Sequence, residues 1–513
     1  MADTFASNLK KIHNPHTGTI FNSTFKLLVD SAIKTMEKDF EPQLIPKAEE
    51  GDDHATLEPI TLVEIKLMLK KLKVKSCPGE DGLSYHIIKN TPDAMLDKIN
   101  QVYNQCLETG YYPKNWKSAI GTMIPKPGKD PTNVSNYRPI SLLKCIGKVF
   151  EKIISNRLVV HMESEGHFNK WQRAYLKNKE AGEHIYRLGK TARTTINKGW
   201  CTGAVLLDVE KAFDAVWHNG LKFKLLTADY NIPMKLIRLM SSFLDSRTIK
   251  VKTGDTFSKV VNLNAGTPQG SVLSPILFLI YVNDIPIATN DKQNTGGQFA
   301  DDLTLWASDK SQKRVNIRLQ KALVKLEKWC ATWRVKLNAA KTQYIMFSKR
   351  GEKPTPNLTL FGEIIQKYVQ VTLLGAILDS RMSLRPHCNM IVTKINQRLS
   401  LLRKIKNTKW GASSDVILKV YKQFIRPVIE YASVILADSR KTNIKCLQLA
   451  QNKALRLALS KPRRTRITTL HTLARVEPIA DRLNYLKNKT IQRFQGSKLM
   501  KELEEIDFLE KCM

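Results

Sequence analysis

The sequence predicts an α+β fold over the front two-thirds of the chain and an all-helical rear third. In the front part, helical spacing of apolar residues alternates with short apolar runs such as Gly203–Asp208. Two apolar arms flank a pair of acids within Gln298–Trp306, a pattern typical of a β-hairpin. Beyond about residue 380 the apolar spacing is helical throughout. A chain of 513 residues has room for two to four domains.

The first elements follow from local patterns. Residues 1–55 are weakly patterned, and Ser23–Phe40 is a possible helix. Apolar residues at helical spacing predict an amphipathic helix over Thr61–Lys73. We expect a strand at Ile120–Pro125 and a helix at 144–162.

The middle of the chain carries the most informative pattern. The apolar run Gly203–Asp208 predicts a buried strand, and the following residues predict an amphipathic helix carrying Phe213, Val216 and Leu221. Helices and short strands then alternate to about residue 350.

The charge balance is strongly basic. Lys and Arg number 82 against 47 acidic residues, a net charge of +35. About half of this excess lies between Arg381 and Leu470, where 20 basic residues face only three acids. Such an excess favours a polyanionic partner, because each neutralised phosphate releases a condensed counterion. The basic zone therefore predicts a surface that grips a nucleic-acid backbone.

Cysteine spacing and hydropathy argue against two classes of protein, small zinc-binding domains and membrane proteins. The eight cysteines are scattered without a CxxC pair, which argues against a zinc ribbon or knuckle and for reduced thiols inside a cell. The most apolar run, Ser271–Val282, is too short to cross a bilayer and contains Pro275. We therefore expect no membrane partner.

Three carboxylates form the candidate catalytic cluster. Asp208 ends the predicted buried strand, and Asp301 and Asp302 lie at the tip of the predicted hairpin. Phosphoryl transfer by two metals needs anionic oxygens that hold hydrated Mg²⁺ without enclosing it. The alternative is that Asp208 is a helix N-cap and that Asp301 and Asp302 are turn formers, which either motif alone would favour.

The order of the surrounding motifs separates these alternatives. Asp208–Asp214 (DVEKAFD), Ala265–Ser271 (AGTPQGS) and Phe299–Asp302 (FADD) follow one another in the order and spacing found in reverse transcriptase palms. Upstream, Ile124–Lys129 (IPKPGK) and Asn136–Leu143 (NYRPISLL) resemble the finger motifs of non-LTR retrotransposon polymerases.

Over about residues 60 to 460 the chain most resembles the jockey-like clade of these enzymes. The resemblance implies a right-hand polymerase fold, with fingers and palm followed by an all-helical thumb and extension. The expected domains are a weakly structured linker remnant at 1–55, fingers and palm at 56–350, palm end and thumb at 351–440, and a basic helical extension at 441–513.

The resemblance also implies roles for individual residues. The ring of Phe213 would lie beneath the incoming sugar and select deoxynucleotides by clashing with a 2′-hydroxyl. Gln269 and Gly270 would line the nucleotide and template pocket. For Phe213 the alternative is a core aromatic residue, which is the commoner fate of phenylalanine.

Two basic residues are further candidates. Arg138 is a potential triphosphate ligand, because guanidinium can bind phosphate oxygens bidentately, and the alternative is a structural or surface arginine. Lys341 resembles the lysine that serves as general acid to pyrophosphate in this superfamily, and the alternative is a solvated lysine. Lys126 and Lys129 could assist at the phosphates.

One box departs from the family pattern. The family shows Gln-x-Gly-Phe in the fingers, whereas this chain has Gln172–Tyr175 (QRAY), so that Ala174 replaces a glycine. Because alanine lacks the freedom of glycine at positive φ, the finger geometry is expected to change.

The resemblance finally implies an activity. We expect an RNA-directed DNA polymerase that uses two Mg²⁺ ions, with Mn²⁺ as a substitute, and dNTPs to extend a DNA primer on template RNA. Full-length jockey-like proteins begin with an endonuclease domain, so we expect that activity to be absent here and supplied in trans. Expected localisation is nuclear and cytoplasmic, and Lys461–Arg466 is either a phosphate-binding cluster or a nuclear import signal.

Two rival interpretations stay open at this point. One is a catalytically impaired or domesticated relic that only binds nucleic acid, which the Ala174 departure supports. The other is a group II intron enzyme, which shares the Phe-Ala-Asp-Asp box but not the rear third.

Overall fold

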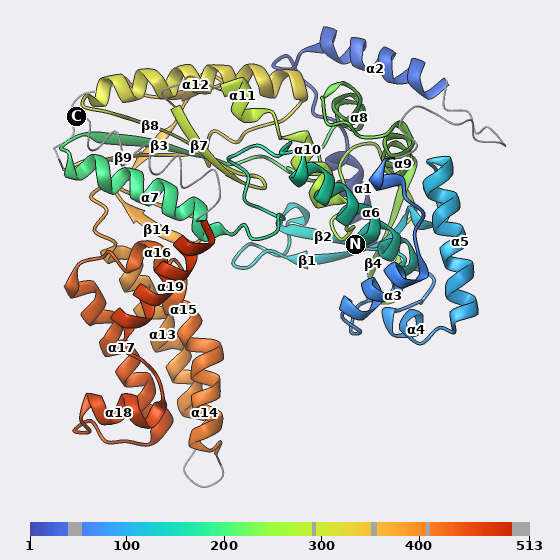
Figure 1. The fold of residues 1–513 in the computed structure, drawn as a ribbon. Helices are drawn as coiled ribbons and strands as arrows, with labels where there is room; N and C mark the ends of the chain where they lie inside the picture. The colour runs from blue at the N-terminus through green and yellow to red at the C-terminus, as the bar shows by residue number, and fades with distance from the viewer. Residues whose placement is uncertain (39–53, 290–293, 350–355, 407–410, 495–513) are drawn as a thin grey trace. The chain divides into compact units, whose positions relative to one another are not determined.

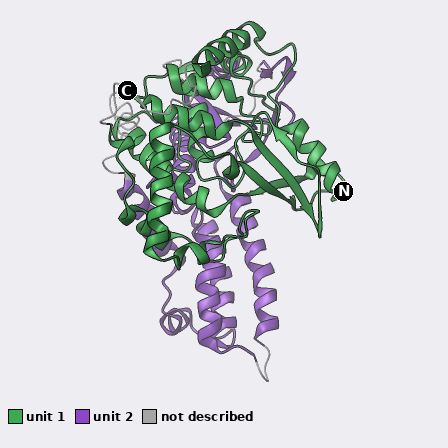
Figure 2. Cartoon of the chain, turned by 90° about the vertical axis from the view of Figure 1, so that its right-hand side faces the viewer, with its two compact units in different colours: residues 1–175, 209–289, 324–338 green, residues 176–208, 290–323, 339–513 purple. Residues whose placement is uncertain are grey.

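The computed structural model describes residues 1–38, 54–289, 294–349, 356–406 and 411–494. The chain divides into two compact units, each made of several segments (Figure 2). Unit 1 comprises residues 1–175, 209–289 and 324–338, and unit 2 comprises residues 176–208, 290–323 and 339–513.

Unit 1 combines helices with one mixed sheet (Figure 1). Its α-helices are α1 (Ala2–Ile12), α2 (Ser23–Lys38), α3 (Leu62–Lys71), α4 (Tyr85–Lys89), α5 (Asp93–Thr109), α6 (Cys145–Ser164), α8 (His218–Thr227), α9 (Met234–Leu244), α10 (Ser274–Tyr281) and α11 (Ile285–Thr289). Its strands are β1 (Ser118–Pro125), β2 (Tyr137–Leu142), β4 (Arg247–Thr253), β5 (Thr256–Phe257) and β6 (Val261–Leu263).

The strand β1 is central to the unit 1 sheet. It pairs with β2 antiparallel and with β4 parallel, and β4 in turn pairs with β5 and β6. The helix α1 packs on this sheet, where Phe5 and Leu9 join a buried cluster with Ile249 and Val251 of β4. The predicted strand at 120–125 is therefore confirmed.

The start of the chain differs from expectation. The helix α2 confirms the possible helix at Ser23–Phe40. The helix α1 was not predicted, so the expectation of a weakly structured remnant is wrong for α1. The physical reason is that Phe5 and Leu9 lie one helical turn apart on α1 and are buried. Residues 39–53 of the predicted remnant, and 495–513 of the predicted extension, lie outside the described residues.

Unit 2 contains the second sheet, with strand order β12-β9-β3-β8-β7. Its strands are β3 (Cys201–Leu207), β7 (Asn294–Phe299), β8 (Asp302–Asp309), β9 (Gln343–Phe347) and β12 (Gln366–Tyr368). Two short antiparallel hairpins complete the described strands of this unit. One pairs β10 (Thr359–Leu360) with β11 (Glu363–Ile364), and the other pairs β13 (Gln370–Leu373) with β14 (Ala376–Asp379).

Helices cover both faces of this sheet, which explains why β3 is apolar almost throughout. The helix α7 (Ala181–Asn197) packs Ile185, Leu188 and Ala192 against one face. The first part of α12 (Gln312–Trp333) covers the other, and in Figure 1 the strands lie between the two helices. A Cβ atom at Gly203 would lie 2.6 Å from the Val315 side chain, so glycine there permits this close approach.

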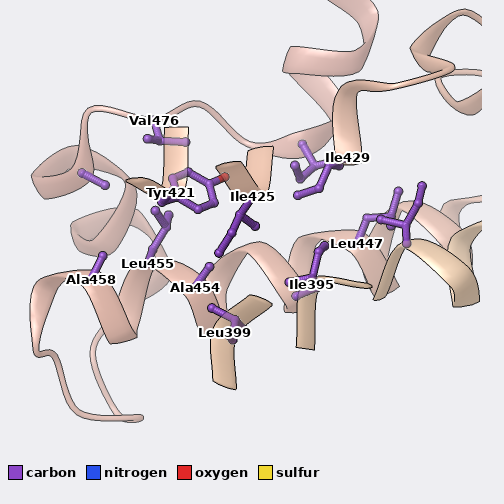
Figure 3. Close-up of a cluster of buried hydrophobic side chains, with 14 of the residues drawn as sticks. Ile395, Leu399, Tyr421, Ile425, Ile429, Leu447, Ala454, Leu455, Ala458 and Val476 are labelled. Carbon is purple, nitrogen blue, oxygen red and sulfur yellow. The ribbon is translucent and has the colours of Figure 1, made fainter. Parts of the chain in front are cut away.

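The rear of unit 2 is helical, as the sequence predicts. Its helices are α13 (Arg385–Ile405), α14 (Ser414–Val420), the π-helical turn Tyr421–Ile425, α15 (Arg426–Glu430), α16 (Ser433–Leu436), α17 (Lys441–Leu459), α18 (Ile467–Ala474) and α19 (Ile479–Phe494). Figure 3 shows their shared core, in which Leu399 of α13, Tyr421 and Leu455 of α17 come together.

The α+β character of the fold is thus confirmed. No helix among the described residues is long and apolar enough to span a bilayer.

Candidate active site

Asp208 directly follows the last residue of β3, the central strand of the unit 2 sheet. The strand itself is buried because β8 and β9 flank it and helices cover both its faces. At Asp208 the chain leaves the sheet, and the residue is only partly buried. The apolar run therefore carries a carboxylate to the rim of the sheet.

The β7–β8 hairpin brings the other two acids to the same rim. Phe299 pairs with Asp302, and Ala300 and Asp301 connect the strands. On the other side of β8, Leu303 pairs with Leu207, so the antiparallel register continues to place Asp302 opposite Asp208. Of the two hairpin acids, the register thus selects Asp302 as the one that faces Asp208.

The turn of this hairpin has an unusual backbone. Ala300 has φ of 54°, in the left-handed region that an alanine rarely occupies. This conformation costs roughly 1–2 kcal/mol relative to the right-handed one. The strained residue directly precedes Asp301, so the turn that presents this acid is held by the two paired strands on either side of it.

The electrostatics show that Asp301 and Asp208 both act on the Asp302 carboxyl. Desolvation, followed by the negative charges of Asp301 and Asp208, raises the pKa of Asp302 to about 6. The Asp302 side chain remains accessible to solvent, so a cation can reach it. A cation placed among these groups would relieve the repulsion.

Lys341 already supplies one positive charge. It precedes β9, the neighbour of β3, and its Nζ atom lies 3.3 Å from Oδ2 of Asp208. Both side chains are largely exposed, at 66% for Lys341 and 42% for Asp208. Such an exposed pair contributes only about 0–1 kcal/mol to stability.

The donor set fits hydrated divalent cations. Carboxylate oxygens at an accessible rim are the ligands that Mg²⁺ prefers, since it keeps several of its waters. Within the described part of the chain, no group of three or more His, Cys, Asp or Glu side chains is placed to hold a metal ion.

Phe213 lies in unit 1, in a turn rather than on a helix. The predicted helix carrying Phe213 is wrong, because α8 begins only at His218. Lys211 has φ of 51°, and the Phe213 carbonyl accepts a hydrogen bond from the Thr267 N–H at 2.8 Å instead of from a helical neighbour. The half-buried Phe213 ring stacks on Phe278, with centroids 4.4 Å apart.

Gln269 and Gly270 also lie in unit 1, in the loop Ala265–Ser271. The Gln269 amide donates from Nε2 to Oδ1 of Asp214 at 2.8 Å. The Ser141 N–H of β2 donates to the Gln269 carbonyl, also at 2.8 Å. Gly270 has φ of 127°, and a Cβ atom there would lie 2.5 Å from the Ser141 carbonyl oxygen, so the glycine is required by contact with protein backbone.

Arg138 is exposed on β2, the strand that also carries Ser141. The neighbouring Lys126 donates from Nζ to the Ser135 carbonyl oxygen at 3.0 Å, so it also has a structural contact in this loop. Lys129 is exposed.

The departure at Ala174 has a simple structural outcome. Ala174 is fully buried, and its N–H donates to Oε1 of Gln172 at 2.9 Å. The positive φ of this segment belongs to Tyr175, at 58°, and not to Ala174. The expectation that alanine disturbs the fingers by lacking positive φ is therefore wrong for this position.

The structure thus distributes the predicted residues between the units. Unit 2 holds the carboxylates and Lys341, whereas unit 1 holds Arg138, Phe213, Gln269 and Gly270. The sequence did not indicate a role for Glu151 and Asp214 of unit 1. Both side chains accept hydrogen bonds from the Ala265–Ser271 loop. The available signal for Glu151 was an acid within the apolar face of a predicted helix.

Comparisons with known proteins show which family and which relatives the chain resembles. Residues 124–378 match the family model described as reverse transcriptase (RNA-dependent DNA polymerase). The chain is similar to the RNA-directed DNA polymerase from mobile element jockey of Drosophila melanogaster, 29% identical over 497 residues, which cover 96% of this chain and 52% of the relative.

Two further relatives give the same picture. The RNA-directed DNA polymerase from mobile element jockey of Drosophila funebris is 30% identical, over 86% of this chain and 48% of the relative. The probable RNA-directed DNA polymerase from transposon BS of Drosophila melanogaster is 31% identical, over 81% of this chain and 46% of the relative. The chain spans about half the length of the curated relatives it matches.

Proposed function

Because this chain belongs to the reverse transcriptases, the RNA-dependent DNA polymerases, we propose that it copies the RNA of a jockey-like non-LTR element into DNA. The observation that carries the proposal is the β3–β8 register, which sets Asp208 opposite Asp302 at an open sheet rim beside Asp301. The pKa of Asp302, raised first by desolvation and then by the charges of Asp301 and Asp208, supports it, because a bound cation would relieve this cost of ionisation.

Reverse transcriptases use divalent metal ions, and we propose two Mg²⁺ ions here, with Mn²⁺ as a substitute. Asp208, Asp301 and Asp302 would hold them. Bound there, the ions would lower the pKa of the primer 3′-hydroxyl and neutralise the charge of the leaving pyrophosphate.

For the remaining residues we propose the roles introduced in the sequence analysis, most of which the resemblance implies. Phe213 is held by stacking on Phe278, which suits a rigid steric gate against a 2′-hydroxyl. Arg138 would bind the triphosphate, and its exposure on β2 keeps the guanidinium accessible. Lys341 would donate a proton to pyrophosphate, and its exposed ion pair with Asp208 is weak enough to be exchanged for phosphate.

The nucleic-acid partners follow from charge and family. We propose that the basic helices of the rear third hold the phosphates of template RNA and DNA primer without reading bases. The primer would be the 3′ end of nicked DNA. Because the target of such a reaction is chromosomal DNA, we propose that the protein acts in the nucleus after synthesis in the cytoplasm.

Primer extension on an RNA template with dNTPs and Mg²⁺ tests the proposal. Wild-type protein should extend the primer, and Asp301→Ala should reduce the rate by about a thousandfold or more, as loss of a metal carboxylate removes transition-state stabilisation. Folding of the variant is checked by circular dichroism. A folded wild-type protein that binds template–primer but never extends it would contradict the proposal and favour the nucleic-acid-binding relic.

A further inference from the structure

The loop Ala265–Ser271 of unit 1 has few hydrogen bonds of its own and is fixed by its neighbours. Its first glycine, Gly266, has φ of 85°, and a Cβ atom there would lie 2.4 Å from the Asp214 carbonyl oxygen. The Gly266 and Thr267 N–H groups donate to the carbonyl oxygens of Val216 and Phe213. The position of the loop is therefore determined by the segment that follows β3 and by the side chains that reach it.

Asp214 controls the side chain of Gln269. The Asp214 side chain is almost fully buried, at 8% exposure for the residue, and its Oδ1 atom accepts from Nε2 of Gln269 at 2.8 Å. A carboxylate can only accept hydrogen bonds, so it selects the NH₂ end of the amide and turns the carbonyl Oε1 away from itself. The same Oδ1 lies 3.9 Å from Nε2 of His13, whose Nδ1 is 3.1 Å from the Ala265 carbonyl oxygen.

Glu151 fixes the other end of the loop. It lies on α6 and is completely buried, and its Oε2 atom accepts from Oγ of Ser271 at 2.5 Å and from the Val272 N–H at 2.7 Å. Its Oε1 atom accepts from the Tyr112 hydroxyl at 2.7 Å. A buried carboxylate is tolerated only when its oxygens are well satisfied, and here both are. The loop is thus attached to a 20-residue helix.

Together these contacts hold the segment from Gln269 to Ser271 on both sides. The carboxylate of Asp214 holds Gln269, the carboxylate of Glu151 holds Ser271, and Gly270 between them packs on the backbone of Ser141. A loop held on both sides keeps a binding group within a few tenths of an ångström of one position, which ligand recognition requires.

We propose that Asp214 and Glu151 are positioning residues that set the orientation of Gln269 and Gly270 toward the incoming dNTP. The inference rests on the proposed function, because that function places Gln269 and Gly270 in the nucleotide pocket. Asp214 acts by fixing which end of the Gln269 amide faces the ligand. Glu151 acts by fixing the backbone at Ser271 and Val272.

The test measures dNTP KM and kcat in primer extension by the full chain. The concentration of active enzyme is taken from the amplitude of the pre-steady-state burst. Asp214→Ala should raise the dNTP KM about tenfold with little change in template–primer affinity, since it frees the Gln269 amide to turn. Asp214→Asn keeps an acceptor oxygen and should stay within about threefold of wild type. Ser271→Ala, which removes only the hydroxyl link to Glu151, should raise KM by about threefold.

Two comparisons separate positioning from general stability. In a Gln269→Ala background, Asp214→Ala should add no further increase in KM, because the residues act as one unit. Asp309→Ala is the matched control, since Asp309 is equally buried at 8% but pairs with Arg314 and Arg318 of unit 2. It should lower the active fraction and leave KM unchanged.

Additive effects of Asp214→Ala and Gln269→Ala, or an unchanged KM in Asp214→Ala, would overturn the inference. Wild-type extension tests the proposed function separately. If wild type binds template–primer without extending it, the affinity for a fluorescent dNTP analogue is measured instead by anisotropy. The same order of variants is then expected, and equal affinities of wild type and Asp214→Ala would overturn the inference.

Discussion

At the scale of single residues, the negative charge of the three candidate acids determines the properties of the unit 2 sheet rim. Asp302 faces Asp208 through the strand register and adjoins Asp301 along the chain, so three negative charges share a small accessible area. The ordinary response of such a group is to bind a proton or a cation. The pKa of Asp302 is raised to about 6, so this carboxyl takes up a proton near that pH.

Cation affinity should therefore depend on pH near 6. Below about pH 6 the Asp302 carboxyl is protonated in the metal-free protein, and Mn²⁺ must displace that proton. The Mn²⁺ dissociation constant should rise by up to about tenfold per pH unit as pH falls from 6 to 5. Electron paramagnetic resonance of free Mn²⁺ measures it.

Two checks accompany this titration. Asp301→Asn removes a repelling charge and should move the pH dependence downward. Stability follows the opposite sign to affinity, because a raised carboxyl pKa means that the folded state binds the proton more tightly than the unfolded state. The ionised Asp302 carboxylate therefore destabilises the metal-free fold above pH 6, and this penalty is relieved as pH falls through 6. Asp302→Asn, which is neutral at every pH, should be more stable than wild type above pH 6, and the difference should shrink as pH falls.

Sugar selection is a second property of one residue. Phe213→Ala should admit ribonucleotides, lowering discrimination against them by about tenfold or more, which corresponds to ~1.4 kcal/mol. Incorporation of rNTPs and dNTPs is compared in single-nucleotide extension. Phe243→Ala, which removes a fully buried phenylalanine of α9, should leave discrimination unchanged. Equal discrimination by Phe213→Ala and wild type would reject the gate.

At the scale of elements, the sequence predicted the strand and the hairpin that carry the candidate acids, but not the long-range contacts that hold them. The strand before Asp208 and the hairpin at Asp301 were predictable, because an apolar run ending in an acid has few other structural solutions. Their register was not, since it depends on pairing between residues about a hundred positions apart. The α+β class and the helical rear third followed from periodicity alone.

The Phe213 segment shows why a periodic pattern can mislead. Phe213 and Val216 have helical spacing, yet their carbonyl oxygens accept hydrogen bonds from Thr267 and Gly266. N–H groups of a distant loop thus bind the carbonyl oxygens that would accept hydrogen bonds within a helix. The positive φ of Lys211 is also incompatible with a right-handed helix. Propensity cannot reveal a competing partner about 50 residues away. Glu151 and Asp214 were missed for the same reason.

The helical core of unit 2 should respond to truncation in a position-dependent way. Leu455→Ala on α17 should destabilise the helices of this core by about 2–5 kcal/mol, because Leu455 is fully buried and leaves a cavity. Leu449→Ala on the same helix, 52% exposed, should stay within about 0.5 kcal/mol. Native-state hydrogen exchange of α17 amides measures both, and equal protection in the two variants would contradict the burial of Leu455.

At the scale of the whole molecule, charge distribution would determine how the proposed nucleic-acid partners bind. About half of the net charge of +35 lies between Arg381 and Leu470, where the acids are few. Binding by such a surface should be strongly salt-dependent and only weakly sequence-dependent.

Neutralising the turn between α17 and α18 tests this distribution. Arg463→Gln with Arg464→Gln, both exposed, should reduce the slope of log affinity against log salt by about one for each phosphate that these arginines neutralise. Lys10→Gln with Lys11→Gln is the matched control, because it removes the same charge from exposed positions of α1. Filter binding at several salt concentrations gives both slopes, and equal slopes would place the phosphate grip elsewhere.

The interleaving of the two units along the chain has a consequence for synthesis on the ribosome. Unit 1 is completed only when residues 324–338 are made, and unit 2 opens at residue 176 but needs the helices after 379. Neither unit can therefore fold in isolation as the chain emerges, although domains often do so in order. Most of the protein must be translated before either core closes, and the long-range β-pairing makes that closure slow. Nascent chains of this protein should consequently depend on holding chaperones for much of their translation time.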